Sequence, residues 1–181
     1  MLAPHPVEIV AYDPQWKVSA QAESDRLHAA LGTSLVTVHH IGSTSVPDLC
    51  AKPIIDLIPV FATEIALDDS RPLIESLGYR CWGELGLPGR RFCTYDDPVT
   101  HRRRIHLHGY LVDSPEIDRH IAFRNYLRAH SEVAREYERV KQACRTQHPS
   151  DSQAYSLCKS DWIKRVERAA LETLSGDGRT G

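Results

Sequence analysis

The chain changes its pattern at Ser114-Pro115. Before this dipeptide, short β-branched and apolar runs alternate with turn residues and two helical stretches, whereas after it the sequence shows only helical periodicity. The runs typical of strands cover residues 7–10, 36–41, 54–60, 79–84, 91–95 and 104–111. A set of strands followed by a set of helices predicts an α+β fold, with a mixed core and a helical extension.

Capping residues bound the expected helices. Asp13-Pro14 and Gly32 predict a helix over 14–31, and a second should start in the 68–72 cluster and end at Gly78. Three more are expected at 115–129, 132–146 and 152–174. We therefore expect a core at 1–112, a C-terminal helical segment packed on it at 113–175, and a disordered tail at 176–181.

Size and composition narrow the class of protein. A chain of 181 residues, 41% of them hydrophobic, can form a core without disulfides or a structural metal. The net charge of −2 argues against a broad nucleic-acid surface. The five cysteines are odd in number and lack C-x-x-C spacing, so we expect free thiols and a cytoplasmic protein. We expect no signal peptide and no membrane span.

The first candidate site combines a turn with an acid. Gly42-Ser43 directly follows a strand candidate, and such a turn can hold phosphate oxygens through backbone N–H groups and a hydroxyl. Asp56 is the one acid in the apolar run 54–60. Burying an acid is costly unless it meets a cation or hydrogen-bond donors, so we expect Asp56 to be functional. The alternative is an acid at a strand edge that faces solvent.

The second candidate is the pair His106 and His108. Alternation along a strand places both imidazoles and Tyr110 on one face. Two histidines at this spacing can ligate one metal ion, or bind phosphate when protonated. A half-exposed polar sheet face would produce the same spacing. Adjacent strand residues face opposite sides, so at most one of His39 and His40 can join such a site.

Arg90 and Arg91 end the glycine-rich loop that follows Glu84. An arginine pair after a glycine turn suits bidentate binding of phosphate or carboxylate. A solvated hairpin tip is the alternative interpretation of this loop.

Two further cations lie among apolar residues of expected helices. Lys159 falls inside the apolar stripe of the last helix, so it either snorkels to solvent or meets an anion in a cleft. Arg124 lies between apolar residues in the same way. The alternative for Arg124 is an ion pair with an acid such as Glu116 or Glu138.

Six motifs follow one another along the chain: HIGSTSVP at 40–47, AKPIID at 51–56, GELGLPGRRF at 83–92, HLH at 106–108, FRNYLRAH at 123–130 and YSLCK at 155–159. Together they resemble the GrpB family, which is placed in the nucleotidyltransferase superfamily with the DNA polymerase β-like fold. The resemblance covers roughly residues 7–170.

The resemblance implies a small mixed sheet flanked by helices, with Gly42-Ser43 as the nucleotide-holding turn. Asp56 is similar to the first metal-binding acid of the superfamily's Asp-x-Asp, whereas Ile58 replaces the second. Asn125 also stands where the family usually has an acid. Superfamily members of this kind use Mg²⁺ to move a nucleoside monophosphate from a triphosphate to an acceptor, and similar members occur fused to dephospho-CoA kinase.

The resemblance also implies a role for each of the candidate residues. Metal-dependent transfer needs enough ligands to hold the ion, so Glu84, His106 or His108 would complete the shell begun by Asp56. Gly42 and Ser43 would hold the triphosphate. The side chains expected to neutralise phosphate charge are those of Lys52, Arg90, Arg91, Arg124 and Lys159.

Three functional hypotheses follow. The first is a Mg²⁺-dependent nucleotidyltransferase, with Mn²⁺ or Zn²⁺ as alternative ions, acting on a nucleoside triphosphate and an unidentified small-molecule acceptor. The second is a nucleotide- or CoA-binding module without turnover, which the missing second acid favours. The third is a transition-metal site made by Glu84, His106 and His108 with other chemistry, including hydrolysis.

Overall fold

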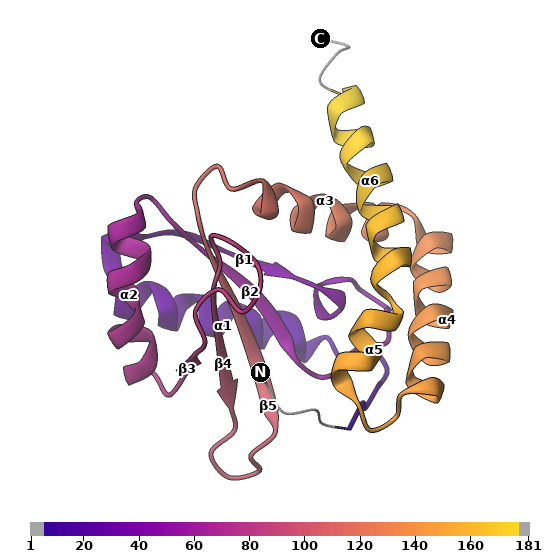
Figure 1. The fold of residues 1–181 in the computed structure, drawn as a ribbon, viewed down its shortest axis with the longest axis horizontal. Coiled ribbons are helices and arrows are strands. Elements are labelled where there is room, and N and C mark those ends of the chain that lie inside the picture. Colours follow the sequence, from indigo (N-terminus) through magenta and orange to yellow (C-terminus); the bar gives the residue numbers. More distant parts are fainter. Residues whose placement is uncertain (1–5, 178–181) are drawn as a thin grey trace.

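A computed structural model describes residues 6–177. Its centre is a five-stranded sheet in the order β1-β2-β5-β4-β3 (Figure 1). The parallel neighbours are β2 and β5, and the other pairs are antiparallel. The strands are β1 Leu35–Ile41, β2 Ile55–Phe61, β3 Arg80–Cys81, β4 Arg91–Asp96 and β5 Arg103–Leu111. The expected α+β fold with a small mixed sheet is confirmed.

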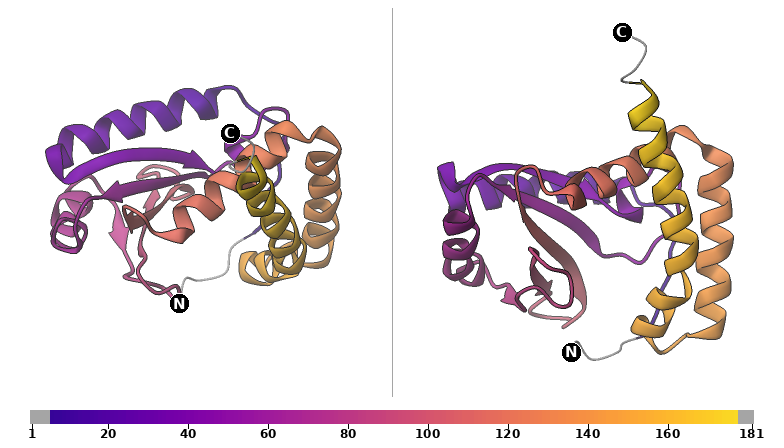
Figure 2. Two further views of the ribbon diagram at one scale, coloured as in Figure 1. Left: turned by 90° about the horizontal axis from the view of Figure 1, so that it is seen from above. Right: turned by 45° about the horizontal axis from the view of Figure 1, so that its top comes forward.

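Helices cover both faces of the sheet (Figure 2). Helices α1 and α2 pack on one face, α3 crosses the other, and α4 to α6 stand beyond the end of α3. Two 3₁₀ turns follow α1 and β1, namely η1 Gly32–Ser34 and η2 Ser43–Ser45. The helices are α1 Gln15–Leu31, α2 Glu64–Ser76, α3 Pro115–Ala129, α4 Ser131–Gln147, α5 Ser152–Cys158 and α6 Ser160–Asp177.

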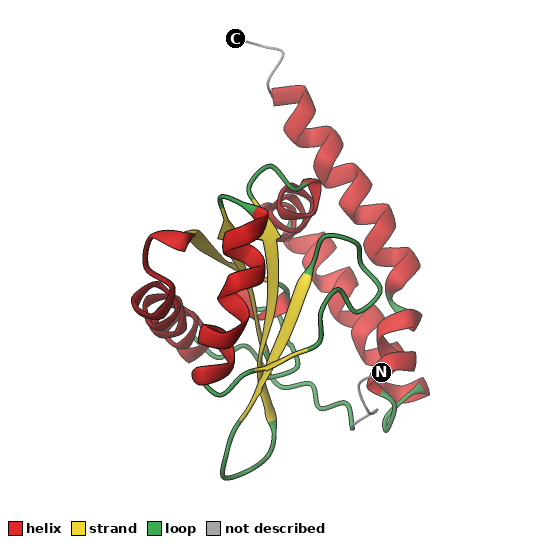
Figure 3. Ribbon diagram, turned by 60° about the vertical axis from the view of Figure 1, so that its left-hand side comes forward, coloured by secondary structure: helices red, strands yellow, loops and turns green. Residues whose placement is uncertain are grey.

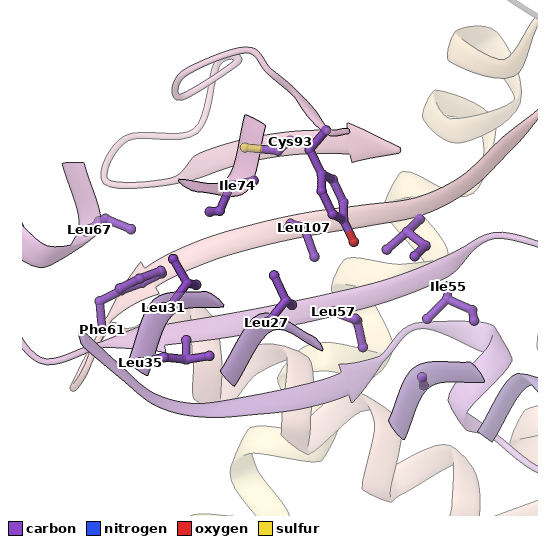
Figure 4. Close-up of a cluster of buried hydrophobic side chains, with 13 residues drawn as sticks. Leu27, Leu31, Leu35, Ile55, Leu57, Phe61, Leu67, Ile74, Cys93 and Leu107 are labelled. Carbon is purple, nitrogen blue, oxygen red and sulfur yellow. The ribbon is translucent and has the colours of Figure 1, made fainter. Parts of the chain in front are cut away.

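The main core lies between the sheet and the α1–α2 layer (Figure 4). Alternate residues of β2 and β5 point into it, among them Leu57 and Leu107, which are each 1% exposed. They pack against Leu27 of α1 and Leu67 of α2. Because strand side chains alternate, the residues between these leucines must point to the opposite face, where α3 lies.

The face below α3 has a smaller apolar core. Ile58 and Tyr110 are buried there with Ile117 of α3. A further cluster joins Val46 and Leu49, which follow η2, to α3, α4 and α6. The C-terminal helices therefore pack against the turn that leaves β1.

Helix α2 begins earlier than the sequence indicated. It starts at Glu64 because the Thr63 side chain accepts a hydrogen bond from Ala66 N and caps the helix. Pro72, which was expected near the first turn, lies inside the helix.

The last expected helix is divided, and the first expected strand is reduced. Helix α5 ends at Cys158, Lys159 is its C-cap, and α6 begins at Ser160. The run 7–10 contributes a single antiparallel bridge from Val10 to Ala51.

The expectation of free thiols is wrong for four of the five cysteines. Cys81 pairs with Cys93, which stands opposite it in the β3–β4 ladder, and Cys144 on α4 pairs with Cys158 on α5. Cys50 is free. Tertiary structure creates both pairs, so the spacing of the cysteines along the chain could not reveal them.

The helices described here include none that is both long and apolar enough to cross a bilayer. The boundary expected at 112/113 falls between the end of β5 and the start of α3. The division into two units stays a prediction. Of the tail expected at 176–181, residues 178–181 lie outside the described part of the chain.

Candidate metal and phosphate site

Asp56, His106 and His108 form one cluster on the α3 face of the sheet. Asp56 stands opposite His106 in the parallel β2–β5 register, and His108 lies two residues further along β5. Asp56 Oδ1 is 2.9 Å from His106 Nδ1 and 3.3 Å from His108 Nε2. The three possible ligand atoms lie within 4.8 Å of one another.

The pKa shifts of Asp56 and His108 favour the protonation states that metal ligation needs. Burial raises the pKa of Asp56, but hydrogen bonds from His106 and His108 outweigh burial and hold that pKa well below its usual range. Burial is also the main reason that the pKa of His108 is lowered. An ionised carboxylate beside a neutral imidazole is the ligating form of both groups.

A glycine brings the turn after β1 against this carboxylate. Gly42 has φ +70°, and a Cβ on it would lie 2.7 Å from Asp56 Oδ2. Ser45 Oγ donates to Gly42 O at 2.6 Å and tightens the turn. The position therefore requires glycine for its backbone conformation and for the close approach of Asp56.

Aromatic rings surround the two histidines. Phe92 of β4 lies with its ring centroid 5.3 Å from that of His106 and 5.2 Å from that of His108. His120 of α3 lies 5.8 Å from the His108 ring. Burial is the main cause that lowers the pKa of His120 to about 3, so this imidazole is neutral at pH 7. No local sequence signal singles out His120, which lies on the face of α3 turned toward the sheet.

Three lysines gather beside two tyrosines of the C-terminal helices. Lys159 Nζ lies 4.1 Å and Lys52 Nζ 5.4 Å from the centre of the Tyr155 ring. Lys141 Nζ lies 4.8 Å from the Tyr137 ring centre and donates to the carbonyl of Cys50. Among the described side chains, none of the three lysines forms an ion pair.

Burial and mutual repulsion lower the pKa values of lysines in this cluster. Burial and then the charges of Lys52 and Lys141 lower the pKa of Lys159 to about 7. Burial likewise lowers the pKa of Lys141 to about 8. Asp56 acts on Lys159 in the opposite direction, so the two clusters are electrostatically coupled. An anion beside these lysines would relieve the repulsion.

Ser43 connects the turn to the same helices. Burial raises the pKa of the Tyr137 phenol, and the Ser43 side chain beside it acts in the opposite direction. Gly42 and Ser43 therefore stand between Asp56 on one side and the helix that carries Lys141 on the other.

The strands of the sheet lie between helices (Figure 3). The two arginines that end the glycine-rich loop contact opposite faces of this sheet. Arg90 is buried, donates to the carbonyls of Glu84 and Leu85, and lies 4.8 Å over the Phe92 ring. Arg91 instead donates to Asp68 of α2 at 2.6 Å. The structure thus brings Arg90, but not Arg91, to the face that carries the histidines.

Glu84 is held within its own loop. Its carboxylate accepts a hydrogen bond from Gly89 N at 2.7 Å and lies 3.8 Å from Arg91 Nη1. The group of possible metal ligands is Asp56, His106 and His108, without Glu84. The structure therefore does not bring Glu84, expected as a possible ligand beside Asp56, into this group.

Arg124 of α3 contacts the end of β1, just before the β1–η2 turn. It donates to His40 O at 2.9 Å, whereas neighbouring Arg128 donates to Ser45 O at 2.6 Å. Neither Glu116 nor Glu138 pairs with Arg124, so that alternative is wrong. His40 Nε2 lies 3.0 Å from Thr44 Oγ1, and neither His39 nor His40 belongs to the ligand group.

A family model described as GrpB protein matches residues 6–169. The chain belongs to the GrpB family. UPF0157 protein YqkA of Bacillus subtilis is 38% identical over 94% of this chain, which spans 49% of YqkA. UPF0157 protein PA4798 of Pseudomonas aeruginosa is 33% identical over 91% of this chain and 68% of its own length. A dephospho-CoA kinase of Mycolicibacterium paratuberculosis is 27% identical over 98% of this chain and 49% of the kinase.

Solved structures agree with membership of the GrpB family. GrpB from Enterococcus faecalis superposes with a TM-score of 0.85 at 37% identity, over 92% of this chain and 99% of that one. The Cid1 poly(U) polymerase with Mg and 3'-dATP bound gives a TM-score of 0.54 at 10% identity, over 76% of this chain and 43% of that chain. The likeness to Cid1 shows a shared nucleotidyltransferase-like fold.

Proposed function

We propose that this GrpB-family chain is a metal-dependent nucleotidyltransferase that moves a nucleoside monophosphate from a nucleoside triphosphate to a small-molecule acceptor. The observation that carries the proposal is the Asp56–His106–His108 cluster, coupled to three lysines that lack carboxylate partners among the described side chains. A cation site beside an anion site is what a metal–triphosphate complex requires. The fold shared with Cid1 supports the same reaction class.

The donor atoms of the cluster fit a divalent metal. Asp56 would offer Oδ1, His106 Nδ1 and His108 Nε2. Nδ1 of His108 is buried without a hydrogen-bond partner in the described chain, so Asp56 is that ring's polar contact. Two imidazoles with one carboxylate favour Mn²⁺ or Zn²⁺ over Mg²⁺, which prefers oxygen ligands. Such an ion, when bound, supplies Lewis-acid stabilisation of phosphate oxygens.

The chain's own residues have separate tasks in this proposal. Lys52, Lys141 and Lys159 neutralise the β- and γ-phosphates, and the Gly42–Ser43 turn holds the triphosphate near Asp56. A nucleophilic atom of the acceptor bonds to the α-phosphorus, the bond from this phosphorus to the bridging oxygen breaks, and pyrophosphate leaves. The proton of the acceptor passes to solvent.

Nucleotide binding with Mn²⁺ and pyrophosphate release test the proposal. We expect the wild-type protein to bind at least one nucleoside triphosphate more tightly with Mn²⁺ than with EDTA. Asp56→Asn should lose the effect of the metal, whereas Glu132→Gln, which removes an exposed carboxylate on α4, should keep it. Nucleotide affinity that is equal with Mn²⁺ and with EDTA in the wild type would contradict the proposal.

A second candidate function is a nucleotide-binding module without turnover. Ile58, which is 0% exposed, stands where a second acidic ligand would be expected, so β2 supplies a single carboxylate. This candidate predicts metal-dependent nucleotide binding with no pyrophosphate release for any acceptor mixture. Release of pyrophosphate that disappears in Asp56→Asn would exclude it.

A further inference from the structure

A cavity of about 710 Å³ lies beside the β1–η2 turn, bounded by α1, α3 and α4. It is separate from the metal and phosphate site, because neither the Asp56 cluster nor the three-lysine cluster lines it. Its wall includes His40 of β1 and Thr44 of η2. Cavities of this volume are typical of sites for small organic ligands.

Cations outnumber acids in this cavity. Its lining includes Lys17, Arg124, Arg128 and Arg135, against the two carboxylates of Asp48 and Glu138. Among the described side chains, none of the four cations forms an ion pair. Glu138 accepts a hydrogen bond from Cys50 N at 3.3 Å.

The two arginines of α3 are fixed in place and keep donors for a ligand. Arg124 donates through Nε and Nη1, and Arg128 donates through Nε and Nη2, in each case to groups of the protein. A guanidinium has five N–H donors, so each arginine retains more than one. Burial and then the charge of Arg128 lower the pKa of Arg124, which agrees with an uncompensated pair of cations.

Part of the wall is apolar. Leu57 and Leu127 form its buried base, whereas Val38, Pro47 and Ala134 keep apolar surface accessible in the cavity. Tyr12 adds an aromatic ring. An inorganic ion alone would leave this apolar surface uncovered, whereas an organic anion would cover both parts of the wall.

We propose that this cavity is a second ligand site of the protein, which binds a small organic anion. The anionic group, a phosphate or a carboxylate, contacts Arg124, Arg128, Arg135 and Lys17. The apolar or aromatic body of the ligand packs on Tyr12, Val38 and Pro47. The site is independent of the proposed transferase reaction, because its lining shares no side chain with the metal and lysine clusters.

Phenyl phosphate, benzoate and inorganic phosphate are suitable probes. Each is titrated into the full chain in the presence of EDTA, so that the metal site does not contribute, and binding is followed by NMR. We expect saturable binding of at least one of the two aromatic anions, with an affinity higher than that of inorganic phosphate. The comparison of phenyl phosphate with benzoate distinguishes the two anionic groups.

Charge-matched variants locate the binding. Lys17 and Arg135 are exposed, so Lys17→Gln with Arg135→Gln should fold, and it should weaken the aromatic anion by about tenfold. Arg104→Gln with Lys164→Gln removes two exposed cations that do not line the cavity and should leave the affinity unchanged. No binding of either aromatic anion, an affinity no higher than that of inorganic phosphate, or equal losses in the two double variants would each overturn the proposal.

Discussion

Asp56 and His106 face each other across the parallel pair β2–β5, with Oδ1 and Nδ1 2.9 Å apart. The register that joins them depends on the opposite face of the sheet, where Leu57 and Leu107 are also opposite each other and fully buried. A shift by one residue would turn the acid into the core and the leucine out of it. The hydrophobic core therefore determines the geometry of the candidate metal site.

Asp56→Asn should destabilise the metal-free protein by about 2 kcal/mol, because two half-buried imidazoles lose a charged hydrogen-bond partner. Since the folded pKa of Asp56 is lowered, its contribution is present above the unfolded pKa of about 3.9 and is lost as the pH falls further. Urea unfolding at pH 7 and at pH 3 measures this difference. Equal stability of the two proteins at pH 7 would show that the hydrogen bonds contribute little.

Gly42→Ala should disrupt the site more than an equivalent change elsewhere. The new methyl group would meet Asp56 Oδ2 at 2.7 Å, in addition to the strain of φ +70°. Gly89→Ala is the matched control, because Gly89 has φ +78° with no atom within 4 Å of the added carbon. We expect Gly89→Ala to lose about 1 kcal/mol and keep metal binding, and Gly42→Ala to lose more and bind metal poorly. The same loss of stability and metal binding in both variants would refute the close approach.

Lys159→Met should weaken nucleotide binding while the protein stays folded. Lys164→Met on the exposed face of α6 is the control and should bind normally. Because the pKa of Lys159 is about 7, nucleotide affinity of the wild type should decrease as the pH rises from 6 to 8. Titrations of Lys159→Met should show a weaker dependence, because Lys141 with a pKa of about 8 remains, and an identical pH profile in both proteins would assign it to another group.

The same substitution also gives a stability prediction with a definite sign. The unfolded chain holds the Lys159 proton up to a pH of about 10.4, but the folded protein releases it near pH 7. Wild-type stability relative to Lys159→Met should therefore rise with pH between these two values. Denaturant midpoints at pH 6, 8 and 10 check this, and a gap that widens in favour of Lys159→Met would contradict it.

The Cys144–Cys158 disulfide should stabilise the C-terminal helices. It closes a loop with a sequence separation of 14 residues, for which removal costs about 3 kcal/mol. Cys144→Ser with Cys158→Ser should lower the unfolding midpoint under non-reducing conditions, whereas Cys50→Ser should not. If reductant leaves the wild-type midpoint unchanged, this disulfide does not contribute to stability.

The local sequence pattern predicted most of the helices and strands and part of the candidate metal and phosphate site. Alternation was sufficient to place His106 and His108 on one face, and the turn signals located Gly42 beside a strand end. Applied to adjacent residues, the same alternation could also have predicted that Arg90 and Arg91 point to opposite faces, as they do.

Contacts between distant segments could not be predicted in the same way. Lys141 is 2% exposed, but its sequence on α4 is that of an ordinary charged helix face. His120 lies beside His108 because α3 crosses the sheet at that point. Cys144 meets Cys158 because α5 turns back on α4. None of these three arrangements has a signature within a few residues of sequence.

Mn²⁺ binding, measured by electron paramagnetic resonance of the free ion, tests the central claim most directly. The wild-type chain, Asp56→Asn and His106→Ala would be compared at pH 7 with Glu132→Gln as the control. The Asp56–His106–His108 site predicts one bound Mn²⁺ per chain in the wild type and in Glu132→Gln, and a loss of at least about tenfold in affinity in the other two variants. Equal Mn²⁺ binding by all four proteins, or none by the wild type, would contradict it.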